Sequence, residues 1–372
     1  MKEALLIIAA SERDADLYYA TRFLAPDPFP FFQIGTERVI MVSDLELGRA
    51  KSQAAVETIL PLQKYEDRAM ERMKQSTLLD AVDEGLREWR VQQLLVPGNF
   101  PTEYADKLRS RGYEVRVKEG TFLEERLVKS DVEIGWIAET QRLAEEAMET
   151  AIQAIREAEI RGNELYRAGE RLNSEGVRRL IQHALLDRDC FAEHTIVAGG
   201  EHGSDPHHEG TGPLLAHRPI VIDIFPRSSG TRYFADITRT VVKGRASLRV
   251  KQMYEAVLEA QAQAVALIRH EADGAAIHQE VTAVFERLGF HTAEADGRMQ
   301  GFFHGTGHGL GLEIHEAPRI GKRGAVLRAG NVVTVEPGLY YSGEGGVRIE
   351  DVVVVTETGC RNLTQFQKVL EI

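Results

Sequence analysis

The chain has 372 residues, of which 43% are hydrophobic and 27% charged, and its formal net charge is −12. This length accommodates two domains with a sizeable core, and the composition argues against extensive disorder. The negative charge argues against nucleic acid as a partner, because binding its phosphates needs clustered Lys and Arg. No apolar run approaches the roughly 20 residues that span a bilayer, so no membrane association is expected. Only Cys190 and Cys360 are present, and the start lacks a small-residue cleavage site, which favours a cytoplasmic protein.

The first part of the chain alternates short apolar runs with amphipathic stretches. Strands are expected at 4–10 and 37–44. Residues 91–98 and 113–120 form a strand–helix–strand pattern with the helix between them, and Gly112 is the expected helix stop. These elements predict a small α/β domain over residues 1–129.

A long helix is expected to open the second domain, residues 130–372, with Ser130 and Glu133 as its capping box. Apolar residues recur along it at helical spacing: Ile137, Ala144, Met148, Ala151, Ile155 and Ala158. Further helices are expected at about 174–187, 247–271 and 275–288. The segments between and after them are β-rich.

An aspartate interrupts the apolar run PIVIDIFP, residues 219–226. In a strand, Asp223 shares its sheet face with apolar neighbours, and burying a bare carboxylate costs several kcal/mol or more. Three further acids recur in apolar β-type contexts: Asp236, Glu336 and Glu350. Four such acids would repel one another, and hard oxygen ligands of this kind are natural receivers of divalent cations.

Few cations lie in these β-rich segments. Arg239 and Arg348 are the ones placed to neutralise an acid there, and Asp351 lies on the opposite face from Glu350. A single buried acid would most often be paired with an arginine. Two arginines cannot neutralise the charge of four acids, so the pattern favours bound metal ions.

The stretch GFFHGTGHGLGLEIHEAP, residues 301–318, carries His304, His308 and His315 among four glycines. Glycine at this density disfavours a helix and lets the main chain approach a ligand closely. If the stretch is extended, His304 and His308 share a face, and His315 faces the other way unless a bulge intervenes. No HExxH helix or CxxC pair is present, so the common single-zinc patterns are absent.

Five residues in a fixed order carry a family resemblance: Asp223, Asp236, His308, Glu336 and Glu350. They resemble the metal ligands of the pita-bread metallopeptidases, which include methionine aminopeptidase, aminopeptidase P and prolidase. The flanking words DITRT, HGTGHGLGLEIHE, TVEPGLY and VRIED are similar too, and the resemblance spans about 130–372. It implies an α+β pita-bread catalytic domain with a smaller N-terminal α/β domain of the creatinase N-terminal type.

The proline-specific branch of the family is indicated by PHH at 206–208 together with His304, His315 and Arg348. Two departures concern the first aspartate. The glycine usual two residues after it is replaced by Phe225, and the spacing of 13 to Asp236 is longer than expected. Two extra residues preserve strand parity, so the ligand prediction stands, whereas the pocket shape and substrate choice are less fixed.

The resemblance implies a mechanism for hydrolysis of short peptides, at X-Pro bonds. Two divalent ions (Mn, Co or Zn) would share a hydroxide that attacks the scissile carbonyl. Asp223 would bind one ion, His308 and Glu336 the other, and Asp236 and Glu350 would bridge both. Glu336 is also a candidate proton acceptor.

Further residues receive roles from the same resemblance. His207 would face substrate, and His304 and His315 would contact the intermediate or pass a proton to the leaving nitrogen. Arg348 would orient Glu350 or face substrate, and a plain structural salt bridge is an equal alternative. His202, His208 and His217 stay unassigned, Tyr340 and Tyr341 are either pocket or core residues, and both cysteines are expected only to pack.

Three functions remain in competition. The leading one is a two-metal exopeptidase, either an X-Pro aminopeptidase or an X-Pro dipeptidase, and the resemblance implies a homodimer. The second is a metal-free amidinohydrolase of the creatinase type, whose members have lost acidic ligands that are all present here. The third is a non-catalytic peptide-binding protein on the same fold.

Overall fold

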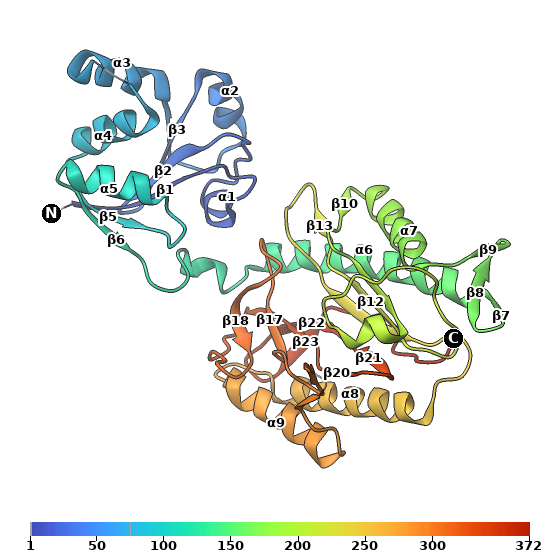
Figure 1. Cartoon of the computed structure of the whole chain (residues 1–372). Coiled ribbons are helices and arrows are strands. Elements are labelled where there is room, and N and C mark those ends of the chain that lie inside the picture. Colours follow the sequence, from blue (N-terminus) through green and yellow to red (C-terminus); the bar gives the residue numbers. More distant parts are fainter. Residues whose placement is uncertain (1, 75, 296) are drawn as a thin grey trace. The chain divides into compact units, whose positions relative to one another are not determined.

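The computed structural model describes residues 2–74, 76–295 and 297–372 (Figure 1). The chain divides into two compact units, the first ending at Glu124 and the second comprising Glu125–Ile372. The sequence pattern placed the division slightly later, after Lys129. In the structure Arg126 and Lys129 both pair with Glu316, which ties this connecting segment to the second unit. None of the described helices is both long enough and apolar enough to cross a membrane.

The first unit is built around one mixed sheet with strand order β4-β3-β2-β1-β5-β6. Its strands are β1 (Lys2–Ala9), β2 (Phe29–Ile34), β3 (Glu37–Val42), β4 (Thr58–Pro61), β5 (Val91–Val96) and β6 (Glu114–Val117). Its helices are α1 (Ala15–Thr21), α2 (Asp44–Gln53), α3 (Leu62–Met73), α4 (Leu78–Glu88) and α5 (Thr102–Ser110). The four expected strands are confirmed, and Gly112, with φ of +95°, lies just beyond the end of α5. Apolar clusters pack in this unit, from β1, β2 and β3 against the helices.

The second unit contains four long helices: α6 (Asp131–Arg156), α7 (Ser174–Leu186), α8 (Leu248–Leu267) and α9 (Gly274–Arg287). One sheet has the order β11-β12-β14, with β11 (Ile196–Gly199), β12 (Ile220–Ile224) and β14 (Ile237–Val241). A second sheet has the order β18-β17-β19-β22-β23, with β17 (Gly307–Gly309), β18 (Glu316–Ile320), β19 (Val332–Val335), β22 (Asp351–Val355) and β23 (Cys360–Asn362). The hairpin of β20 (Gly338–Tyr341) and β21 (Gly345–Arg348) forms a separate two-stranded sheet, and β21 contacts β12 and β14.

Short elements complete the second unit and its junction with the first. They are the 3-10 turns η1 (Glu124–Arg126) and η2 (Gly200–Ser204), the sheet β7 (Glu159–Arg161), β8 (Glu164–Arg167) and β9 (Glu170–Arg171), and the pairs β10 (Cys190–Phe191) with β13 (Arg227–Ser228) and β15 (Ala293–Ala295) with β16 (Arg298–Gln300). The longer turn after Asp223 is therefore not a simple hairpin tip. After β12 the chain forms β13, which pairs with β10, before it continues to β14. Asp223 nevertheless pairs with Thr238 of β14.

Two helical layers enclose the strands of the second unit (Figure 1). On one side, α6 and α7 pack their apolar residues against β11, β12 and β14. On the other, α8 and α9 pack against β19, β21 and β22. The expected capping box at the start of α6 is confirmed, because the Ser130 and Glu133 side chains each bind the other's main-chain N–H. The helix expected at 247–271 ends earlier, at Leu267, because Ile268 adopts an extended conformation.

The glycine-rich stretch forms a hairpin and not one extended strand. Strand β17 contains His308, β18 returns beside it, and the pairing shifts register between His308 and Gly309. His315 lies at the end of the connecting loop, just before β18. The parity argument that separated His315 from His308 therefore does not apply, and their rings meet edge to face with centroids 4.4 Å apart.

Candidate metal centre

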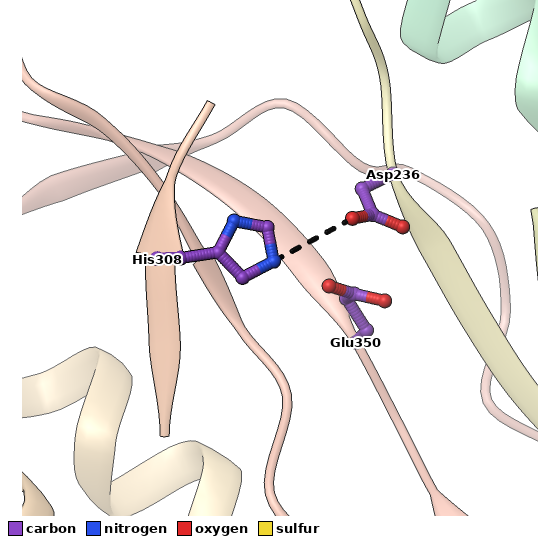
Figure 2. Close-up of side chains that lie close together, drawn as sticks. All are labelled: Asp236, His308 and Glu350. Atoms are coloured by element: carbon purple, nitrogen blue, oxygen red, sulfur yellow. Dashed lines mark ion pairs between the residues drawn. The ribbon is translucent and has the colours of Figure 1, made fainter. Parts of the chain in front are cut away.

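Three side chains from distant segments converge on one point in the second unit (Figure 2). Asp236 lies just before β14, His308 is in β17, and Glu350 lies between β21 and β22. Each offers a ligand atom, and these atoms all lie within 4.8 Å of one another. All three residues are buried. Convergence of two carboxylates and an imidazole on one buried point is the geometry of a metal site.

The tautomer of His308 leaves one ring nitrogen facing the acids. Its Nδ1 donates to the carbonyl oxygen of Gly309 at 3.1 Å, so Nε2 carries the lone pair. That Nε2 lies 3.7 Å from Asp236 Oδ2 and 3.4 Å from Glu336 Oε1. Burial, together with the neighbouring His315, lowers the pKa of His308 to about 3, so the ring is neutral and able to ligate.

Asp223 joins the cluster from β12, and its partner is Arg348. The Arg348 guanidinium donates to Asp223 Oδ2 at 2.6 Å, and both residues are buried. The second oxygen, Oδ1, is buried and has no hydrogen-bonding partner among the residues that the structure describes. Arg348 therefore forms a salt bridge with Asp223, and because it also lines the cavity, its substrate-facing role stays a prediction.

Asp236 and Glu350 form no ion pair with a lysine or arginine of the described chain, and neighbouring acids raise their pKa values. Burial raises the pKa of Asp236 well above its usual range, and the charges of Glu350 and Asp223 add to the effect. Burial and the charge of Glu336 likewise raise the pKa of Glu350, whose Oε2 accepts from Thr238 Oγ1 at 2.7 Å. Glu350 Oε1 is buried without a partner in the described part of the chain. These acids resist ionisation until a cation arrives.

Glu336 shows the same perturbation. Its side chain is 19% exposed, and burial raises its pKa to about 7 although the Arg348 charge acts in the opposite direction. Glu336 lies between β19 and β20, and its main-chain N–H donates to the Thr306 carbonyl at 2.8 Å. A carboxyl poised near neutrality beside a cluster of acids is typical of a functional site.

The predicted catalytic histidines lie around the same cavity. His304 Nδ1 donates to the Gly305 carbonyl at 2.8 Å, and its Nε2 accepts from the Tyr340 hydroxyl at 2.9 Å. Arg348 donates to that hydroxyl at 2.8 Å, which directs the tyrosine proton toward His304. Burial and the Arg348 charge lower the pKa of His304 to about 3, and burial also lowers that of His315. Both rings are therefore neutral near pH 7.

A cavity of about 650 Å³ opens over these residues. All the sequence-predicted site residues line it: His207, Asp223, Asp236, His304, His308, His315, Glu336, Arg348 and Glu350. Arg319, which the sequence analysis missed, lines it as well. Its guanidinium forms no hydrogen bond or ion pair with any other described side chain. Arg319 is the register partner of His308 across the β17–β18 hairpin. A single extended strand would not contain this pairing, so the sequence pattern did not point to Arg319.

The residues left unassigned lie elsewhere. His202 and His208 stack with ring centroids 4.3 Å apart and line a separate cavity of about 540 Å³. His217 Nδ1 accepts from the Arg245 main chain at 2.9 Å. The Tyr341 hydroxyl donates to the His291 carbonyl, so only Tyr340 of the tyrosine pair reaches the site residues.

Comparison with known proteins gives the family. Residues 135–357 match metallopeptidase family M24. The chain belongs to this family. An Xaa-Pro dipeptidase of Pyrococcus furiosus is 30% identical over 339 residues, which cover 90% of this chain and 87% of the relative. The structure of an Xaa-Pro dipeptidase from Bacillus anthracis has a TM-score of 0.82 at 25% identity, covering 100% of this chain and 95% of that one. The prolidase from Pyrococcus horikoshii OT3 has a TM-score of 0.79 at 25% identity, covering 99% and 95%.

These likenesses confirm the pita-bread fold, with an additional N-terminal domain, and identify the chain as a hydrolase, a metal-dependent peptidase. The residues present fit a metal. Two buried carboxylate oxygens lack partners in the described structure, on Asp223 and Glu350, and His308 presents a lone pair to the same region. Oxygen ligands with one imidazole suit divalent ions such as Mn²⁺.

Proposed function

We propose that the second unit binds two divalent ions and cleaves short peptides at X-Pro bonds. The observation that supports two ions is the excess negative charge of the acids at the cavity. Three buried acids and the partly buried Glu336 meet at the cavity, and Arg348 is the one cation paired with any of them among the described residues. With all four acids ionised and Arg348 charged, one divalent ion would leave this group negative, whereas two ions together with a hydroxide that they share would neutralise it. Buried uncompensated charge is strongly unfavourable.

In this proposal Asp223 would hold one ion, His308 and Glu336 would hold the other, and Asp236 and Glu350 would be shared between them. Asp236 and Glu350 suit the shared position because they form, with His308, the group that converges within 4.8 Å. Bound there, the ions would activate a water and stabilise negative charge on the scissile carbonyl oxygen. Mn²⁺, Co²⁺ and Zn²⁺ are the candidates, since mixed oxygen and imidazole sites accept all three.

The chain's own residues would position substrate and move protons. Glu336, at the cavity wall, would accept a proton from the attacking water at its carboxylate. His315 and His207, both exposed to the cavity, would donate hydrogen bonds to the peptide carbonyl or relay the proton taken up by Glu336 to the leaving nitrogen. His304 is held by Gly305 and Tyr340 and would present a fixed face to the substrate.

The choice of an X-Pro dipeptide rests on the relatives and on Arg319. The most informative relatives carry the name Xaa-Pro dipeptidase. Arg319 lines the cavity as a cation with no partner among the described side chains, and a guanidinium suits a free carboxylate. A dipeptide would place its C-terminal carboxylate one residue beyond the scissile bond, within the same cavity. We therefore favour dipeptidase over aminopeptidase activity.

Three further assignments belong to the proposal. The catalytic domain is residues 130–372, and residues 1–129 form a separate N-terminal domain. The protein is a homodimer, as the family resemblance implies. It works in the cytoplasm, as its two unpaired cysteines suggest.

A peptide panel tests the function. The chelator-stripped chain is assayed with Mn²⁺, Co²⁺ or Zn²⁺ on X-Pro dipeptides, their C-terminal amides and X-Pro tripeptides. We expect metal-dependent cleavage of the free-acid dipeptides. Release of only the first residue from tripeptides would indicate an aminopeptidase instead, and no cleavage of any peptide with any metal would overturn the proposal.

The variant Arg319→Met separates carboxylate recognition from chemistry. We expect it to raise KM for free-acid dipeptides by about 10–100-fold, the range of a lost charge-assisted hydrogen bond, and to leave KM for the amides nearly unchanged. An equal effect on acids and amides would contradict the role given to Arg319.

A further inference from the structure

Three of the four acids lie where a strand is broken. Asp236 precedes β14, Glu336 lies between β19 and β20, and Glu350 lies between β21 and β22. Buried main-chain N–H and C=O groups require hydrogen-bonding partners, and the clustered acids repel one another. No regular strand pairing holds these positions. The Glu336 and Glu350 N–H groups donate to the Thr306 and Thr238 carbonyls, which leaves the carbonyls that precede these acids, and both main-chain groups of Asp236, to be held by other partners.

The side-chain amide of Gln141, on α6, takes the place of a neighbouring strand at Asp236. Its Nε2 donates to the Asp236 carbonyl at 2.8 Å, and its Oε1 accepts from the Asp236 N–H at 3.0 Å. The same Nε2 donates to Thr364 Oγ1 at 3.1 Å. Gln141 is fully buried, on the apolar face of its helix between Ile137 and Ala144.

Gln261, on α8, holds the other two acids through the residues that precede them. Its Nε2 donates to the Val335 carbonyl at 2.9 Å and to the Ile349 carbonyl at 3.2 Å. Its Oε1 accepts from Lys368 Nζ at 2.7 Å. Gln261 is 1% exposed, so water does not compete for these bonds. One amide thus ties together the two chain segments that deliver Glu336 and Glu350.

The two glutamines occupy corresponding places in the two layers of the second unit. Each lies on the first helix of its layer, and each reaches the main chain at the acids that its layer covers. We infer that Gln141 and Gln261 are positioning residues that fix the backbone of the metal-binding acids. The inference rests on the proposed function, because it takes these acids as ligands.

Methionine variants test the inference, because methionine matches glutamine in length but cannot donate or accept these bonds. The readout is the Mn²⁺ dissociation constant of the chelator-stripped chain, measured by isothermal titration calorimetry. Loss of groups that hold metal ligands typically weakens metal binding by about 10–100-fold, and we expect this range for Gln141→Met and for Gln261→Met. Far-UV circular dichroism checks that each variant is folded.

Matched controls come from the same two helices. Thr140→Val, next to Gln141, removes a buried hydroxyl that donates to the Trp136 carbonyl within α6. Tyr254→Phe, on α8, removes a buried hydroxyl without a partner in the described chain. Both controls are expected to bind Mn²⁺ within about twofold of the native chain. A general loosening of α6 or α8 would weaken binding in the controls as well, and that result would overturn the inference.

Two further outcomes separate the inference from the function on which it rests. A native chain that binds two Mn²⁺ and cleaves dipeptides, with both methionine variants binding within twofold of it, would overturn the inference alone. A native chain that binds no Mn²⁺ would overturn the proposed function and the inference with it. Where a methionine variant does not fold, Gln141→Asn or Gln261→Asn replaces it. Asparagine keeps a buried amide, but its side chain is one methylene shorter and does not reach the same partners. We expect the same weakening of Mn²⁺ binding.

Discussion

Replacing Glu336 by glutamine removes a partly buried acid at nearly constant size, and we expect the variant to be more stable than the native chain when no metal is bound. Burial raises the pKa of Glu336 from 4.5 to about 7 in the folded chain. At about 1.4 kcal/mol for each pKa unit, this rise corresponds to about 3 kcal/mol. Between the two pKa values the unfolded chain holds fewer protons than the folded one, so stability falls as the pH rises from about 4.5 to about 7. The Glu336→Gln variant has no carboxyl group at this position, so its stability does not fall in this way as the pH rises.

Urea unfolding in the presence of a chelator measures the difference. The chain has two tryptophans, and a Trp89→Phe background leaves Trp136, which packs against Tyr233 in the second unit, as the sole reporter. At pH 8 we expect Glu336→Gln to be more stable by about 3 kcal/mol, and at pH 5 by less than about 1 kcal/mol. The buried histidines titrate in both proteins, so their contributions largely cancel in the difference.

Either of two results would refute this reasoning. One is a Glu336→Gln variant that is less stable than the native chain at pH 8 without metal. The other is a stability difference that is the same at pH 5 and pH 8, since the effect would then not come from ionisation. Saturating Mn²⁺ provides the complementary test. The native chain gains the free energy of metal binding, and the variant, having lost a charged ligand, should gain less.

Two other substitutions have defined outcomes. Tyr340→Phe deletes the hydroxyl that donates to His304 and accepts from Arg348, which leaves His304 Nε2 without its donor, and we expect kcat/KM to fall by about 10–100-fold in peptide assays. Arg239→Met removes a buried guanidinium that binds Asp351 and the carbonyls at Glu350, Phe366 and Gln367, and we expect the free energy of unfolding in urea to fall by about 3–5 kcal/mol.

Each of these substitutions has a matched control. Tyr341→Phe removes a hydroxyl that binds the His291 carbonyl away from the cavity, and it should leave kcat/KM unchanged. Arg142→Met removes an exposed arginine from surface ion pairs with Glu139 and Glu146, and it should cost no more than about 0.5 kcal/mol. If the Tyr340 and Tyr341 variants behave alike, or if the Arg239 variant loses less than about 1 kcal/mol, the roles assigned to those contacts are wrong.

The positions of the candidate ligands could be predicted because their signal is local. Asp223, Glu336 and Glu350 each interrupt an apolar run, and burial of that run follows from composition alone. Their partners could not be predicted in the same way. Arg348 is two residues from Glu350 in sequence, yet its carboxylate partner is Asp223, 125 residues away, because the pairing depends on how two sheets meet.

The glycine-rich stretch shows a second limit of the sequence analysis. Glycines permit both an extended strand and a tight return, so local propensity does not choose between them. The hairpin that formed brings His315 to His308 and places Arg319 beside the cavity. Gln141 did leave a signal, since it is a polar residue within the apolar stripe of α6, although the stripe alone does not reveal what it contacts.

The hydrogen bonds around the acids are divided in a way that favours metal binding. Asp223 and Glu350 each have one oxygen held, by Arg348 and Thr238 respectively, and one buried oxygen left without a partner in the described structure. Arg239, next to Thr238 in the chain, donates to main-chain carbonyls and to Asp351, and to neither of these two oxygens. If such donors bound the carboxylates, they would lower the pKa values and stabilise the metal-free chain, but they would compete with the ions. Holding the backbone while leaving the carboxylate oxygens open keeps the acids close together against their repulsion. The same repulsion that destabilises the metal-free chain thereby becomes the driving force for metal binding.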